Sequence, residues 1–187
     1  DVATLKHIGV QDGVLSVGAC TTLSRLLSFF SAGACRSEAM VNLLKRFGSK
    51  QIRNRATIGG NLCSASPIGD LIPALLVLEA TAVLTRANGS RILDLEEFIE
   101  GYRKTALAKD EYLSKISLSI PESWSSFAFR KLSKRYEDDI SSVSIAVFLL
   151  HDNVRINEIR IALGGAGDRA LRLFEVEKII LGRRLID

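Results

Sequence analysis

The sequence predicts an α+β protein, in which antiparallel strands and amphipathic helices occupy separate parts of the chain. Strand patterns occur at Val14–Cys20, at Tyr112–Ile120 and repeatedly after Pro121. Apolar residues at helical spacing fill much of the sequence between the first two strands. With 187 residues, of which 47% are apolar and 25% charged, the chain has an ordinary globular composition and is long enough to bury a sizeable core.

Composition argues against several classes of protein. No apolar run reaches the roughly 18–20 residues of a membrane span, and the first residues lack the pattern of a signal peptide. The three cysteines Cys20, Cys35 and Cys63 are few and widely spaced, which favours a reducing, cytoplasmic location over a disulfide framework or a metal site. Because the sequence does not begin with Met, we expect a fragment or a processed subunit.

The net charge of +4 and a pI near 9.1 allow an anionic partner. The basic residues look dispersed along the sequence, however, and a dispersed excess is more typical of a solvated surface than of a nucleic-acid footprint. We therefore expect neither a nucleic-acid nor a membrane partner.

The first half of the chain predicts one strand followed by two capped helices. After the strand Val14–Cys20, Thr21 or Thr22 caps a helix that ends before Gly33. Ser37 begins the next helix, and Gly48 is the expected C-cap. This places Phe47 at the helix end, as a core residue or as an aromatic edge for a planar ligand.

The segment Phe47–Pro73 is the centre of the sequence, because glycines and prolines are packed there among short polar residues. Such a segment is expected to bend repeatedly and to expose backbone N–H groups. Asp70 occupies the N-cap position of a helix expected from Leu71 to about Ala80, with Pro73 in its first turn. The segment is a candidate site for an anionic or heterocyclic ligand, and a purely structural glycine-rich crossing is the alternative.

The next stretch predicts a hairpin and a short helix. T-A-V-L-T-R and R-I-L-D flank Asn88-Gly89, a typical type I′ turn. Asp94 and Glu97 have the spacing of a capping box for a helix to about Glu100. G-Y-R-K-T then follows in a loop, either as a solvated basic turn or within reach of a ligand.

A change of composition near Pro121 predicts two domains, 1–121 and 122–187. The second contains three strand patterns, at Ser126–Leu132, Val143–Leu150 and Val154–Leu163, and then a helical pattern that ends at Gly182. We expect a three-stranded antiparallel sheet with one helix.

No familiar catalytic motif is present. His7 and His151 lack recognisable partners, and the sequence contains no G-x-S-x-G, H-E-x-x-H or Walker motif. We therefore expect no catalytic nucleophile and no metal ligands. Y-E-D-D-I at Tyr136–Ile140 is an acidic cluster between strands, which either tunes a cofactor or is a solvated turn.

Taken together and in order, these motifs resemble the FAD-binding domain of the molybdenum hydroxylases. The ordered motifs are Phe47, Q-I-R-N-R-A-T-I-G-G-N, S-P-I-G-D-L-I-P, G-Y-R-K-T, F-A-F-R-K-L-S-K-R-Y-E-D-D-I and A-L-G-G-A-G, and they cover nearly the whole chain. G-Y-R-K-T and E-D-D-I look most like xanthine dehydrogenase. The resemblance implies the second lobe of a two-lobed FAD-binding domain, followed by part of a C-terminal domain.

The resemblance also implies a set of FAD-binding residues and a group that influences where the electrons leave. Phe47 matches an aromatic beside the cofactor, Asp70 an acidic contact near the ribose, and Lys131 the lysine before a mobile acidic loop. Leu113 matches a strand residue packed on the flavin, although its spacing to Pro121 is longer than in many relatives. The segment that would wrap the FAD consists of Thr57, Ile58, Gly59, Gly60 and Asn61. The electron-exit group consists of Tyr102, Asp138 and Asp139.

The implied function is electron transfer from iron–sulfur clusters through FAD to NAD, with molybdopterin and the clusters on other domains or subunits. The family's glycine-rich loop of A-G-G-T-D-L type does not occur in this sequence, so we expect the fragment alone to be inactive and free of FAD. The alternative is a non-catalytic basic domain that binds nucleic acid or a partner protein.

Overall fold

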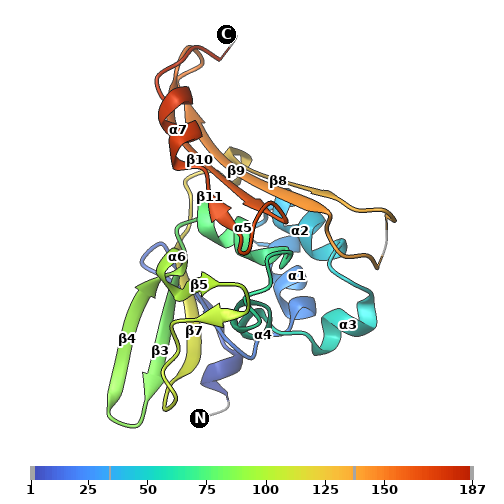
Figure 1. The fold of residues 1–187 in the computed structure, drawn as a ribbon, viewed down its shortest axis with the longest axis vertical. Coiled ribbons are helices and arrows are strands. Elements are labelled where there is room, and N and C mark those ends of the chain that lie inside the picture. The colour runs from blue at the N-terminus through green and yellow to red at the C-terminus, as the bar shows by residue number, and fades with distance from the viewer. Residues whose placement is uncertain (1–2, 34, 137, 186–187) are drawn as a thin grey trace.

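The structure is a computed structural model that describes residues 3–33, 35–136 and 138–185. It confirms the α+β class: two antiparallel sheets lie on either side of a group of helices (Figure 1). The larger sheet has the order β1-β2-β7-β3-β4, and every neighbouring pair is antiparallel. Its strands are β1 (Ile8–Gln11), β2 (Val14–Gly18), β3 (Thr81–Arg86), β4 (Gly89–Asp94) and β7 (Tyr112–Ser119).

Five helices lie between β2 and β3 in the sequence, and side chains cap the first four. Thr22, Ser37, Ser49 and Thr57 each accept a hydrogen bond from the amide three residues further on. The helices are α1 (Leu23–Ser31), α2 (Glu38–Lys45), α3 (Lys50–Arg55), α4 (Ile58–Cys63) and α5 (Leu71–Val77). The prediction of Gly48 as the C-cap of α2 was wrong, because that helix already ends at Lys45 with Arg46 as its C-cap.

Two other local predictions need correction. The β3–β4 hairpin exists, but its two-residue loop is Ala87–Asn88, and Gly89, at φ +143°, is already the first residue of β4. Asp94 precedes the helix α6 (Leu95–Phe98) without making a side-chain cap, so the expected capping box does not form. A small hairpin of β5 (Ile99–Gly101) and β6 (Lys104–Thr105) then carries Tyr102 and Arg103 at its tip.

The second sheet contains the three expected strands and a short fourth one. Its order is β11-β10-β9-β8, all antiparallel. The extra strand β11 (Leu171–Arg172) occupies the start of the predicted helix, so α7 begins later. The elements are β8 (Phe127–Leu132), β9 (Val143–His151), β10 (Ile156–Gly164), β11 and α7 (Phe174–Ile180). Short 3₁₀ turns cover Thr4–Lys6 and Trp124–Ser126.

The helix α5 joins the two sheets into one core. All seven of its residues are buried, and β9, β10 and β11 pack against it (Figure 1). Phe127, Phe129 and Phe148 from the second sheet belong to the same apolar cluster as Leu15 and Leu84 from the first. Neither sheet therefore has a separate core. No helix among the described residues is long and apolar enough to cross a membrane.

Candidate functional site

A cavity of about 350 Å³ lies where α2, α3, α4 and the N-terminus of α5 meet the loop between β8 and β9. This volume is at the low end of the roughly 300–1,000 Å³ typical of ligand pockets. Six of the residues predicted from the sequence line it: Phe47, Asn61, Asp70, Lys131, Asp138 and Asp139. Residues more than 80 positions apart in the sequence are thus brought together around one space.

The segment Thr57–Asn61 is a short helix and not an open glycine-rich loop. Neither Gly59 nor Gly60 has a positive φ, and Thr57 caps the helix by accepting a hydrogen bond from the Gly60 amide at 3.0 Å. The Ile58 amide donates to Thr21 O, the Gly59 amide to Ala19 O and the Asn61 amide to Thr57 O. The expectation of exposed amide donors was therefore wrong for residues 58–61, because all four of these donors have acceptors within the protein.

The two glycines serve different purposes. A Cβ at Gly59 would lie 2.7 Å from both the Cβ and the carbonyl oxygen of Ala19, so this glycine lets α4 pack directly on the chain after β2. Gly60 is exposed, and a Cβ there would meet only Thr57 Oγ1, at 3.1 Å. Gly60 thus leaves open space on the solvent side of α4, where a ligand can approach the backbone closely.

Asn61 offers a polar group to the cavity. Its Oδ1 atom is buried and has no hydrogen-bond partner among the described residues. Since a buried acceptor without a partner is costly, a ligand donor at this position would be favourable. Together with Phe47 and the open surface at Gly60, this acceptor fits part of a large planar and polar cofactor such as FAD.

Asp70 and Lys131 are engaged with each other. Lys131 Nζ lies 2.7 Å from Asp70 Oδ2, and the two side chains are 3% and 7% exposed. Ser141 Oγ donates to the other carboxylate oxygen of Asp70. Lys131 Nζ also donates to Asp139 O at 2.8 Å and to Arg46 O at 3.3 Å. Asp70 is the N-cap residue of α5, as predicted, but its side chain makes no cap hydrogen bond, and its ion pair instead ties α5 to β8 and the acidic loop.

The two aspartates of the acidic loop differ in environment. Asp139 accepts the amides of Arg135 at 2.8 Å and Ile140 at 3.0 Å, and these bonds with the nearby cations lower the pKa of its carboxyl group. Asp138 is exposed at φ +51° beside the cavity. Asp139 therefore organises the loop, which the alternative of a solvated turn does not explain, while Asp138 is available to the cavity. Glu137 of the same cluster lies outside the described residues.

The structure adds Arg46, which the sequence analysis missed. Its Nη1 donates to Lys131 O at 2.7 Å, its Nη2 donates to Ser133 Oγ at 3.0 Å, and its guanidinium lies 4.8 Å from the Tyr136 ring centroid. Arg46 thus holds the β8 end of the acidic loop from the C-terminus of α2. No local pattern signals these contacts, because they join residues 85 or more positions apart.

Two predicted residues do not line the cavity. Leu113 is 5% exposed in the core strand β7, paired with Leu84. Tyr102 is 62% exposed at the β5–β6 hairpin tip, which is tied to the end of α4 by the Arg103 amide donating to Ala65 O at 3.1 Å. The structure therefore leaves their predicted roles without a contact to this cavity.

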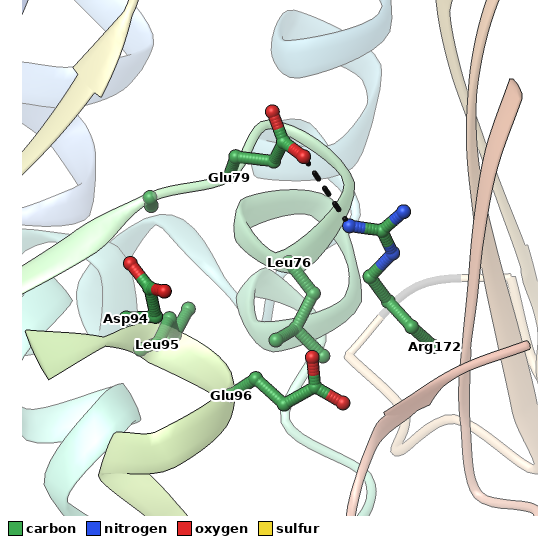
Figure 2. A pocket seen from close by; sticks show the side chains of 7 residues that line it. Leu76, Glu79, Asp94, Leu95, Glu96 and Arg172 are labelled. Carbon is green, nitrogen blue, oxygen red and sulfur yellow. Dashed lines mark hydrogen bonds and ion pairs between the residues drawn. The ribbon is translucent and has the colours of Figure 1, made fainter. Parts of the chain in front are cut away.

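A second cavity, of about 290 Å³, lies between the end of α5, the start of α6 and β11. Figure 2 shows Glu79 and Arg172 facing each other across it, with Nη1 and Oε1 3.4 Å apart. Arg172 also pairs with Glu177 at 2.7 Å, and Glu79 pairs with Arg160. The two Glu79 pairs connect the turn between α5 and β3 to β10 and β11 of the second sheet, and Arg172–Glu177 connects β11 to α7. None of the predicted cofactor residues lies here. The described residues contain no cluster of His, Cys, Asp and Glu suited to a metal ion.

Comparison with known proteins gives two family matches. The model of the FAD binding domain in molybdopterin dehydrogenase matches residues 1–122, and that of the CO dehydrogenase flavoprotein C-terminal domain matches residues 128–187. Caffeine dehydrogenase subunit beta from Pseudomonas sp. (strain CBB1) is 30% identical over 98% of this chain and 62% of its own length. Xanthine dehydrogenase 2 from Arabidopsis thaliana is 32% identical over 97% of this chain and 14% of its own length.

A solved structure shows the same fold. The carbon monoxide dehydrogenase from Hydrogenophaga pseudoflava that lacks the Mo-pyranopterin moiety superposes with a TM-score of 0.89 and 26% identity. The match covers 98% of this chain and 63% of that chain. The present chain thus spans about three fifths of the length of its subunit-sized relatives.

Proposed function

This chain belongs to the family of FAD binding domains in molybdopterin dehydrogenases, and from that membership we propose that the cavity beside Phe47 and Asn61 receives part of the FAD of such an enzyme. Within the proposal, residues 1–121 form the second lobe of the FAD domain and 122–187 part of the next domain. The shared core at α5 implies that the two act as one rigid support.

The observation that carries the proposal is that six residues assigned from the order of the sequence motifs converge on one cavity that is also lined by a residue with an unpartnered buried acceptor. Phe47 provides an aromatic face, and the exposed Gly60 lets the cofactor come close to the backbone of α4. Asn61 Oδ1 would accept a hydrogen bond from the cofactor. Asp70 and Lys131, which were expected to contact it directly, would shape the cavity through their mutual ion pair.

When bound, FAD would supply the redox chemistry, accepting electrons and passing them on as a hydride to NAD. The chain's own part would be to orient the cofactor, to exclude water from it and to place the charge of Asp138 beside it. The donor of electrons would be an iron–sulfur domain or subunit, next to a molybdopterin-binding one.

We place the enzyme in the cytoplasm because its cysteines are few and unpaired, which is typical of proteins in a reducing compartment. The fragment alone would be inactive.

The experiment is to isolate the complete polypeptide with its partners and to record its visible spectrum and its reduction of NAD and of oxygen. We expect a flavin spectrum and NAD reduction. A flavin-free protein that is retained on nucleic acid in a salt-dependent way would instead support the basic binding domain. A flavin spectrum with reduction of oxygen alone would remove NAD from the proposal.

A further inference from the structure

We infer that the exposed surface of α2 and α3 is a docking surface for an acidic protein. This basic face is defined by Arg36, Lys45, Lys50 and Arg55. The inference rests on the proposed function, because the partner would be the iron–sulfur protein that delivers electrons to the flavin.

The charge of the chain is concentrated in one stretch, although it looks dispersed along the sequence as a whole. Residues 21–57 contain seven basic residues and one acidic residue, a net charge of +6, whereas the whole chain carries +4. All other residues together therefore carry −2. Since α1 packs against both α2 and α3, this excess is also concentrated in space.

Three of the seven cations have structural partners. Arg25 Nη1 donates to Lys6 O at 2.6 Å, Arg53 Nη1 to the carbonyl oxygens of residues 45, 47 and 48, and Arg46 to the acidic loop. The four cations of the basic face are exposed and have no carboxylate partner among the described residues. A cluster of unpaired like charges repels itself and so tends to destabilise the compact state, which is consistent with a role in binding.

The basic face borders the candidate flavin cavity. Phe47 and Gly48, between Lys45 and Lys50, line that cavity, and so does Ile52 of α3. Ile52 is 46% exposed, and Ile140 and Tyr136 of the neighbouring loop are 69% and 74% exposed. A partner docked here would therefore lie against the mouth of the cavity, where electrons must enter or leave.

The chemistry of the surface favours a protein as partner. Arg36 lies two residues before the first residue of α2, and Lys45 is its last residue. The eight-residue helix is about 12 Å long, so these two cations are too far apart for one pyrophosphate group to bridge. Exposed aliphatic residues among charged ones are typical of the apolar centre and polar rim of protein interfaces. Nucleic-acid surfaces instead commonly use more phosphate contacts and stacked aromatics.

The test uses the complete flavin-carrying polypeptide and its own iron–sulfur partner. Lys50→Glu with Arg55→Glu reverses the basic face. Lys109→Glu with Lys115→Glu produces the same change of net charge at exposed sites in and just before β7 of the large sheet. Flavin content is measured first, and then the association rate of the two proteins at low and at high ionic strength.

We expect normal flavin content in both variants. The association rate of the basic-face variant should fall by about tenfold or more at low ionic strength, and the difference should largely vanish at high ionic strength. The control should associate like the wild type. If Lys50→Glu with Arg55→Glu unfolds the protein, Lys50→Gln with Arg55→Gln should give a smaller drop in the same direction.

Wild-type association of a folded, flavin-containing basic-face variant would overturn the inference and leave the proposed function intact. Loss of salt-dependent RNA retention without any effect on association would also overturn it, because the surface would then bind nucleic acid. Absence of flavin from the wild-type protein itself would instead refute the proposed function.

Discussion

Lys131 and Asp70 form a buried ion pair, with 2.7 Å between Nζ and Oδ2, that connects the second sheet to the N-terminus of α5. The residues are 61 positions apart, and the pair lies beneath the acidic loop, whose backbone Lys131 also holds through Asp139 O. The wall of the candidate cavity is therefore built from contacts that only tertiary folding creates.

Removing one member of this pair should destabilise the protein strongly. Lys131→Met leaves the Asp70 carboxylate buried without its cation, and such a loss costs about 3–5 kcal/mol. Combining Lys131→Met with Asp70→Leu should recover much of that loss, because no uncompensated charge remains. Urea unfolding of both variants measures the two free energies. A cost below about 1 kcal/mol for Lys131→Met would show that the pair does not hold β8 against the N-terminus of α5.

Glu111 should make part of the stability dependent on acid. Hydrogen bonds from Arg91, at 2.8 and 2.9 Å, and from the Ala108 amide hold the pKa of Glu111 at about 2. A lowered pKa in the folded state means that the carboxylate stabilises the protein fully above the ordinary value of 4.5 and progressively less as the pH falls towards 2. Unfolding free energies of the wild type and Glu111→Gln should therefore converge between pH 5 and pH 2. Curves that stay parallel over this range would contradict the assignment.

Asp138 and Asp139 should respond differently to the same substitution. Asp138→Asn keeps a residue that tolerates positive φ and removes an exposed charge, so stability should change by less than about 0.5 kcal/mol. Asp139→Asn weakens the carboxylate that accepts two loop amides, so its unfolding free energy should fall clearly below that of Asp138→Asn in urea unfolding.

The ratio of NAD reduction to oxygen reduction by the complete enzyme tests whether Asp138 and Asp139 also influence where the electrons leave. Both variants should alter that ratio, Asp138→Asn through charge and Asp139→Asn through the displaced loop. An unchanged ratio in Asp138→Asn would mean that this charge does not act on the cofactor.

Local rules predicted the parts of the fold that depend on neighbouring residues. The caps at Thr22 and Ser37, the strand Tyr112–Ser119 and the strands of the second sheet follow from side-chain chemistry and periodicity. The helix α4 was missed because two consecutive glycines disfavour a helix, and tertiary bonds to Ala19 and Thr21 overcome that preference. Asp70 occupies the predicted N-cap position, but its side chain does not cap the helix, since its partners come from residues 131 and 141.

The candidate site could also be predicted only in part, because some of its contacts depend on neighbouring residues and others on tertiary folding. Motif order identified the residues around the cavity, but the pairing of Asp70 with Lys131 and the clamp by Arg46 required the folded chain. Leu113 faces the core because a register shift in β7 lies between its pairing and that of Lys115. A spacing count from Pro121 cannot detect such a bulge.

Flavin content in the Gly60→Val variant shows whether FAD lies against the open surface of α4. A Cβ at Gly60 meets only Thr57 Oγ1, at 3.1 Å, so the lobe itself should fold, whereas Gly59→Val collides with Ala19 and should destabilise it. We therefore predict that Gly60→Val in the complete polypeptide keeps its unfolding temperature but loses its bound flavin. Wild-type flavin content in a folded Gly60→Val protein would contradict the account.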